Sequence, residues 1–189
     1  MRITRNQIAR SALLAFMVAA QGCVKVGVNR VTPTTGATTV IIVRHAEKGI
    51  DDPRDPSLTQ SGRERAIALR DVLIDANVSA IYATQYRRNR QTAEPLAQQL
   101  GLTVIERPVN AANSATYAAD IAREVLNTNQ GKTVVIVGHS NTVPQIVQAF
   151  SRVAVKAMED SEYDHIFIVV VPAGGSPSLV NVRFGRPAP

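Results

Sequence analysis

The stretch Thr39-Val40-Ile41-Ile42-Val43-Arg44-His45-Ala46-Glu47 decides the fold of this chain. Its four consecutive apolar β-branched residues are typical of a strand that is buried on both faces of a parallel sheet. The run stops abruptly at Arg44 and His45. Because ligands bind at the carboxyl ends of strands in open α/β sheets, this pair is a candidate binding site.

A second run of the same kind, Thr133-Val134-Val135-Ile136-Val137-Gly138-His139-Ser140, also ends in a histidine. If the two strands lie side by side, His45 and His139 meet at one edge of the sheet. The stretch Tyr86–Leu96 lies between them and is a basic cluster that opens a helix.

The remaining elements alternate between helical and strand periodicity. Their order predicts a three-layer α/β/α sandwich with a mostly parallel mixed sheet, because helical crossovers make strands parallel and the last two strands read as a hairpin. The expected helices span 59–75, 88–100, 115–128 and 141–152, and the expected further strands span 78–84, 102–106, 166–172 and 178–184.

The first residues do not belong to this domain. Residues 1–22 combine three arginines, a short apolar run and small residues, which indicates a secretory signal peptide. Ala20-Gln21-Gly22-Cys23 resembles a bacterial lipobox, and a lone cysteine in an exported protein needs a reason. We therefore expect a lipid on Cys23, a flexible tether over 23–38 and a domain over 39–189, anchored to a membrane of the bacterial envelope and facing the periplasm. Plain export and a cytoplasmic location are the alternatives.

Composition restricts the possible partners. The net charge is +6 for the whole chain and +3 once residues 1–22 are removed. There is no Trp and only 4% of the residues are aromatic. The chain thus lacks the basic stripe and the aromatic platform of a nucleic-acid-binding protein, and small phosphorylated anions are the expected ligands.

Four ordered motifs resemble the histidine phosphatase superfamily, the phosphoglycerate mutase-like clan, in its small-phosphatase branch. They are Val43–Glu47, Leu58–Gly62, Arg88–Glu94 and Val137–Ser140, and the resemblance covers roughly residues 39 to 185. The resemblance implies that His45 is the nucleophile, and that Arg44, Arg88 and His139 form the phosphate pocket, with Ser140 beside it.

The same residue types suit phosphoryl transfer on physical grounds. Two arginines present planar donor forks to phosphate oxygens and stay charged near neutral pH. A neutral His45 could then attack phosphorus and carry the group as phosphohistidine. Because the arginines offset the developing charge, we expect neither a metal nor a cofactor. Arg87 and Arg90 are interpreted as surface residues, His165 as structural, and Glu47 with Lys48 as a local ion pair.

The proton donor is the point at which the motifs are incomplete. The family places an acid after the strand that follows the second arginine's helix, and Glu106 is the acid found there. Asp51, Asp52 and Asp55 are the rivals. This sparse supply of acids favours substrates with good leaving groups, or phosphoramidates.

Three other functions stay open at this point. One is a phosphoglycerate mutase-like phosphotransferase, and a second is an envelope lipoprotein that binds phosphate-bearing ligands without turnover. The third is an interaction module of the cell envelope. The sequence leaves monomer and dimer equally open.

Overall fold

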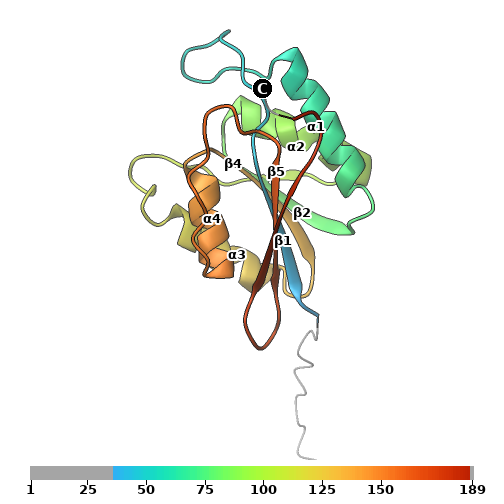
Figure 1. Cartoon of the computed structure of the whole chain (residues 1–189), viewed down its shortest axis with the longest axis vertical. Coiled ribbons are helices and arrows are strands. Elements are labelled where there is room, and N and C mark those ends of the chain that lie inside the picture. The colour runs from blue at the N-terminus through green and yellow to red at the C-terminus, as the bar shows by residue number, and fades with distance from the viewer. Residues whose placement is uncertain (1–35, 188–189) are drawn as a thin grey trace, which may run out of the picture. The chain divides into compact units, whose positions relative to one another are not determined.

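The computed structural model describes residues 36–187 as a six-stranded sheet with helices on both faces (Figure 1). The strands are β1 (Thr38–Arg44), β2 (Val78–Ala83), β3 (Val104–Glu106), β4 (Thr133–Gly138), β5 (His165–Val171) and β6 (Ser178–Arg183). The helices are α1 (Gln60–Leu73), α2 (Arg87–Leu100), α3 (Tyr117–Thr128) and α4 (Thr142–Ser151). This order confirms the predicted α/β class.

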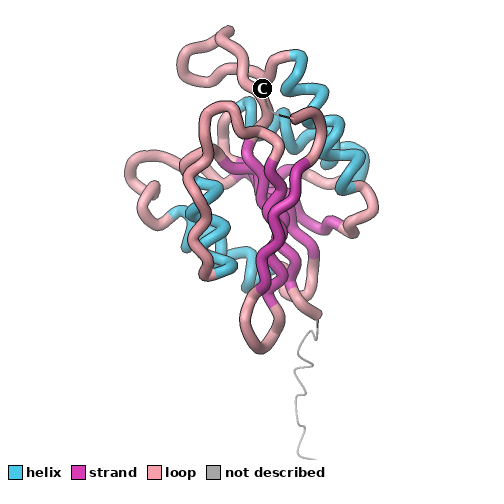
Figure 2. Tube along the Cα trace, viewed as in Figure 1, coloured by secondary structure: helices cyan, strands magenta, loops and turns pink. Residues whose placement is uncertain are grey.

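The sheet has the strand order β3-β2-β4-β1-β5-β6. β1 pairs in parallel with β4 and antiparallel with β5, and the β5–β6 hairpin closes one edge (Figure 2). The sheet is therefore mixed, as predicted. Arg44 at the end of β1 lies opposite Gly138 at the end of β4, so the two histidine-bearing ends share one edge.

Burial on both faces explains the uninterrupted apolar run of β1. Val40 and Ile42 pack in a core layer with residues of α3 and α4, whereas Ile41 and Val43 pack in a second layer with residues of α1 and α2. Figure 1 shows these helix pairs on opposite sides of the sheet. Alternate residues of one strand thus hold the two outer layers together.

Helix boundaries follow their capping residues. Thr59 caps α1 by accepting a hydrogen bond from the backbone N–H of Gly62, at 3.0 Å. Gly101 ends α2 in the left-handed conformation, with φ at 65°.

Several boundaries differ from the predictions by one or two residues, among them the starts of β1, β3 and α3. β1 begins at Thr38, inside the segment predicted as tether, and β3 begins at Val104 rather than at residue 102. α3 begins at Tyr117 rather than at residue 115, because side-chain hydrogen bonds hold the preceding segment in turns. The Asn113 side chain accepts from the backbone N–H of Asn110, and the Asn110 side chain accepts from the backbone N–H of Ala112.

The predicted signal peptide, Cys23 and most of the tether lie outside the described residues. Within residues 36–187 no helix is long and apolar enough to cross a membrane.

Candidate active site

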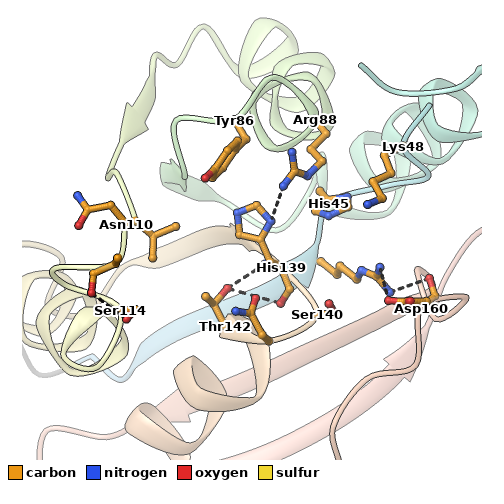
Figure 3. A pocket seen from close by; sticks show the side chains of 14 residues that line it. His45, Lys48, Tyr86, Arg88, Asn110, Ser114, His139, Ser140, Thr142 and Asp160 are labelled. Atoms are coloured by element: carbon orange, nitrogen blue, oxygen red, sulfur yellow. Dashed lines mark hydrogen bonds and ion pairs between the residues drawn. The ribbon is translucent and has the colours of Figure 1, made fainter. Parts of the chain in front are cut away.

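A pocket of about 400 Å³ opens at the carboxyl ends of β1 and β4 (Figure 3). The structure brings His45, Arg44, Arg88, His139 and Ser140 together in its lining. The ring centroids of His45 and His139 are 5.3 Å apart, in an edge-to-face arrangement. The motif residues that the sequence singled out therefore converge.

His45 has one defined neutral form. Its Nδ1 lies 2.8 Å from the carbonyl oxygen of Ala46, and a carbonyl only accepts, so Nδ1 carries the proton. The lone pair is then on Nε2. Burial lowers the pKa of His45 to about 3, and the neighbouring charges of Arg88 and Arg44 act in the same direction. At neutral pH the ring is therefore neutral, with its proton on Nδ1 and a free lone pair on Nε2.

His139 is held from two sides. The Arg88 guanidinium only donates, so its Nη2 donates to Nδ1 of His139 at 3.5 Å, and Nε2 of His139 then donates to the Thr84 hydroxyl at 3.0 Å. Burial lowers the pKa of His139 to about 4, with Arg88, Arg44 and Lys48 adding to the shift. Thr84 is fully buried at the end of β2 and was not predicted.

Arg44 is fixed by a distant segment. Its Nη1 lies 2.8, 3.0 and 3.1 Å from the carbonyl oxygens of Glu159, Asp160 and Glu162. Its guanidinium lies 4.1 Å from the ring centroid of Tyr163. Nε of Arg44 is buried without a protein acceptor, as are Nε and Nη1 of Arg88. These N–H groups are donors without a partner in the described part of the protein.

The helix that carries Arg88 is tied to both histidine strands. Thr92 accepts from the backbone N–H of Ala46 at 2.9 Å, next to His45. Asn89 donates to the carbonyl oxygens of Val137 and Gly138, at 3.1 and 2.9 Å, next to His139. These contacts explain why polar residues occupy the buried face of α2.

Gly138 is needed for a close approach. A Cβ at this position would lie 2.9 Å from Oγ1 of Thr142 and 3.0 Å from a methyl of Val143. Thr142 in turn accepts a hydrogen bond from the backbone N–H of His139, at 2.9 Å. A side chain at 138 would therefore displace His139.

The structure does not bring Glu106 to the pocket. Its carboxylate is partly exposed and lies 3.5 Å from Nη1 of Arg90, on the outer side of α2, so its assignment as proton donor is corrected. Asp55 lies beside the pocket, 3.7 Å from Nη1 of Arg88. Asp51 is paired with Arg87 at 3.7 Å, outside the lining. Asp52 also lies outside the lining, where it accepts backbone N–H bonds within its own loop.

Asp160 is the acid that does line the pocket among the described residues, and it was not predicted. Its side chain is fully exposed and lies 4.0 Å from Nη2 of Arg44. One signal in the sequence pointed to this segment: it directly precedes β5, and an antiparallel β5 begins where β1 ends.

Glu47 does not pair with Lys48 as expected. It forms a two-pronged ion pair with the buried Arg65 of α1, with Nη2 of Arg65 at 2.7 Å and Nε at 2.9 Å from Oε1. Lys48 instead lines the pocket. His165 lies in the hairpin, where it contacts Asn181. Within residues 36–187 no cluster of three His, Cys, Asp or Glu side chains is arranged to hold a metal ion.

Two histidines and two arginines thus line one pocket at the edge of a mixed α/β sheet. A sequence model of the histidine phosphatase superfamily (branch 1) matches residues 40–109, from β1 to the segment after β3. This part of the chain is similar to members of that superfamily. No curated protein matches the chain significantly.

Solved structures share the fold. The protein histidine phosphatase SixA, complexed with tungstate, superposes with a TM-score of 0.62 at 16% identity, covering 77% of this chain and 96% of its own. A mycobacterial glucosyl-3-phosphoglycerate phosphatase gives 0.60 at 15% identity, covering 76% and 97%. A phosphoserine phosphatase from Entamoeba histolytica gives 0.58 at 16% identity, covering 78% and 96%. These neighbours are phosphatases, and at this identity they show the fold alone.

Proposed function

We propose that this protein is a phosphatase that hydrolyses phosphomonoesters or phosphoramidates through a covalent phosphohistidine on His45. The observation that carries the proposal is the state of the His45 ring. Its Nδ1 is bound to the Ala46 carbonyl, its pKa is lowered to about 3, and the ring lies in the same pocket as Arg44, Arg88 and His139.

The reaction has two displacements. Nε2 of His45 attacks phosphorus, and the bond from phosphorus to the leaving oxygen or nitrogen breaks with its electron pair on the leaving group. The buried N–H groups of Arg44 and Arg88 bind the equatorial oxygens, on which charge develops. Water then attacks the phosphorus of the phosphohistidine, the bond from phosphorus to Nε2 breaks with its electron pair on Nε2, and inorganic phosphate leaves. The arginines supply the charge that a metal would otherwise supply, so the proposed reaction is metal-independent.

The position of the acids favours certain leaving groups. Glu106 lies outside the pocket, and the carboxylate of Asp160 is fully exposed to solvent, 4.0 Å from Nη2 of Arg44. A substrate whose leaving group departs without help from a strong acid is therefore preferred. Aryl phosphates have stable leaving anions, and phosphoramidates can take up a proton on nitrogen before the bond breaks.

Rapid quenching in alkaline detergent, which preserves phosphohistidine, tests the intermediate. We expect wild type, mixed with ³²P-labelled substrate and quenched, to retain acid-labile and base-stable label, and His45→Ala to retain none. Hydrolysis is expected to continue in the presence of a chelator. Label retained by His45→Ala, or wild-type turnover of p-nitrophenyl phosphate without trapped label, would overturn the mechanism.

A series of aryl phosphates tests the role of the leaving group. We expect kcat/KM to rise as the pKa of the leaving phenol falls, because no strong acid protonates it. A flat series would show that a proton donor acts in the pocket. If Asp160→Asn then makes kcat/KM depend steeply on the pKa of the leaving phenol, Asp160 is that donor.

A phosphate-binding protein without turnover is the second candidate, and the displacement of Glu106 from the pocket favours it. Burst kinetics separate the two functions. An enzyme releases p-nitrophenol in a burst followed by turnover, whereas a binding protein holds phosphate without releasing any phenol.

We also propose that the domain acts at the bacterial envelope, facing the periplasm, with a lipid on Cys23. The basis is the sequence of residues 1–23. In detergent phase partition, the wild-type chain should enter the detergent phase and Cys23→Ser the aqueous phase. Radioactive palmitate should label the wild-type chain and not Cys23→Ser.

A further inference from the structure

The charges in the pocket exceed what a single phosphoryl group requires. Three basic side chains line it, those of Arg44, Lys48 and Arg88, against one acidic side chain, that of Asp160. Arg44 lies near Asp160, and Arg88 lies near Asp55. Both arginines also carry the buried N–H groups that suit the transferred phosphoryl group. Lys48 is therefore a third cation without a role in that transfer.

Lys48 lacks a protein partner for its charge. It forms no ion pair within the described part of the chain, and its acidic neighbour Glu47 is bound to Arg65. The ammonium acts on the pocket nonetheless, because its charge contributes to the lowered pKa of His139. Figure 3 shows Lys48 on the side of the pocket where His45 lies, with Asn110 and Ser114 on the other side.

The backbone holds Lys48 in place at this opening. Lys48 forms an antiparallel bridge with Leu58, and the neighbouring Gly49 N–H donates to the Ser57 carbonyl at 2.7 Å. The Glu47 carbonyl accepts from the Thr59 N–H at 2.9 Å. The side chain thus starts from a fixed point beside the nucleophile.

We propose that Lys48 binds a second anionic group of the substrate, so that the site prefers phosphate esters whose leaving part carries a carboxylate or another phosphate. This inference rests on the proposed phosphatase function. The wall of the pocket that includes Asn110 and Ser114 carries no charged side chain. Lys48 is therefore the group that discriminates between an anionic leaving part and a neutral one of the same shape.

Paired substrates test the inference. The 3- and 4-carboxyphenyl phosphates are each compared with the corresponding carboxamide, which has nearly the same shape without the charge, and 4-(phosphonomethyl)phenyl phosphate supplies the second-phosphate arm. We expect wild type to prefer the charged member of each pair in kcat/KM. Lys48→Gln should reduce this preference roughly fivefold, the size of an ion pair open to solvent. Added salt should reduce the wild-type preference in the same direction.

Two variants serve as controls. Lys48→Arg keeps the charge and should keep the preference. Arg54→Gln removes a cation from the same loop without touching the pocket lining, and should also keep it. An equal preference in wild type and Lys48→Gln would overturn the inference.

Binding measurements distinguish this inference from the proposed function. Calorimetry with 4-carboxybenzylphosphonate and 4-carbamoylbenzylphosphonate needs no turnover. If wild type hydrolyses none of the esters, the phosphatase proposal fails, but weaker binding of the carboxylate by Lys48→Gln would still support the role of Lys48. Equal binding of both phosphonates by the two proteins would contradict that role even if turnover is found.

Discussion

Tyr163 is the residue that completes the environment of Arg44. The guanidinium is bound to the carbonyl oxygens of Glu159, Asp160 and Glu162 along one edge, and its flat face lies 4.1 Å from the Tyr163 ring centroid. The same ring lies 6.1 Å from the His45 ring. Tyr163 therefore helps to fix the plane of the Arg44 guanidinium beside His45.

We expect Tyr163→Leu to lower kcat/KM roughly tenfold, because a partly buried cation–π contact of this kind contributes between 1 and 2 kcal/mol. The inhibition constant for inorganic phosphate should rise as kcat/KM falls, since phosphate binding and catalysis both depend on the orientation of Arg44. Steady-state kinetics and phosphate inhibition provide the measurements.

Tyr163→Phe is the matched control for this position. It keeps the ring and removes only the hydroxyl, so it should stay within about twofold of wild type. If Phe and Leu at this position lower kcat/KM equally, the ring does not orient Arg44. If neither changes phosphate binding, Tyr163 has only a structural role.

At the scale of elements, the contact between α1 and the loop after β1 depends on a glycine. A Cβ on Gly62 would meet the carbonyl oxygen and backbone of Glu47 far inside van der Waals distance. Gly62 also supplies the N–H that Thr59 caps, and Arg65, one turn on, binds the Glu47 carboxylate. The start of α1 thus packs directly on the backbone two residues after His45.

Gly62→Ala should lower the free energy of unfolding by about 1–3 kcal/mol, because the added methyl forces α1 and this loop apart. Urea denaturation measures the loss. Gly174→Ala is the control, since no atom lies within 4 Å of a Cβ there, and it should leave the midpoint nearly unchanged. If the two substitutions lower the free energy of unfolding equally, the contact between α1 and the loop accommodates the added methyl without loss of stability.

The elements that could be predicted are those whose residues repeat with a local period. β1 and β4 were recognisable as apolar β-branched runs, and α1 and α2 by their apolar spacing and their Thr59 and Gly101 caps. Because a strand carries its own end to the edge of the sheet, the sequence predicts that His45 and His139 meet if the two strands lie side by side.

The rest of the site depends on contacts that no local pattern encodes. The carbonyl groups around Arg44 come from residues 115 to 118 positions further along the chain, and Tyr163 follows them in the same segment, which has no periodic pattern. Glu106 lies 3.5 Å from Arg90 of α2, a contact between two elements that no local pattern encodes. Thr84 is indistinguishable in sequence from an ordinary residue at a strand end, and only the position of His139 shows its role.

For the molecule as a whole, burying two histidines beside two arginines makes stability depend on pH. His45 is 4% exposed and His139 is 8% exposed. Burial lowers their pKa values to about 3 and about 4, against an ordinary value of 6.5. Between pH 6.5 and about 4 the unfolded chain therefore binds protons at both positions, whereas the folded chain does not. The free energy of unfolding must fall as the pH is lowered through this window.

We expect each of the two histidines to contribute a loss of about 1.4 kcal/mol per pH unit once the pH is below 6.5. Urea denaturation at pH 8, 6 and 5 measures the slope in wild type and in the double variant His45→Gln, His139→Gln. At pH 8 these histidines are neutral in both states, so the difference between the proteins there reports packing alone. Below pH 6.5 the wild-type curve should fall more steeply than that of the variant, and parallel curves would show that the two rings do not stay neutral in the folded site.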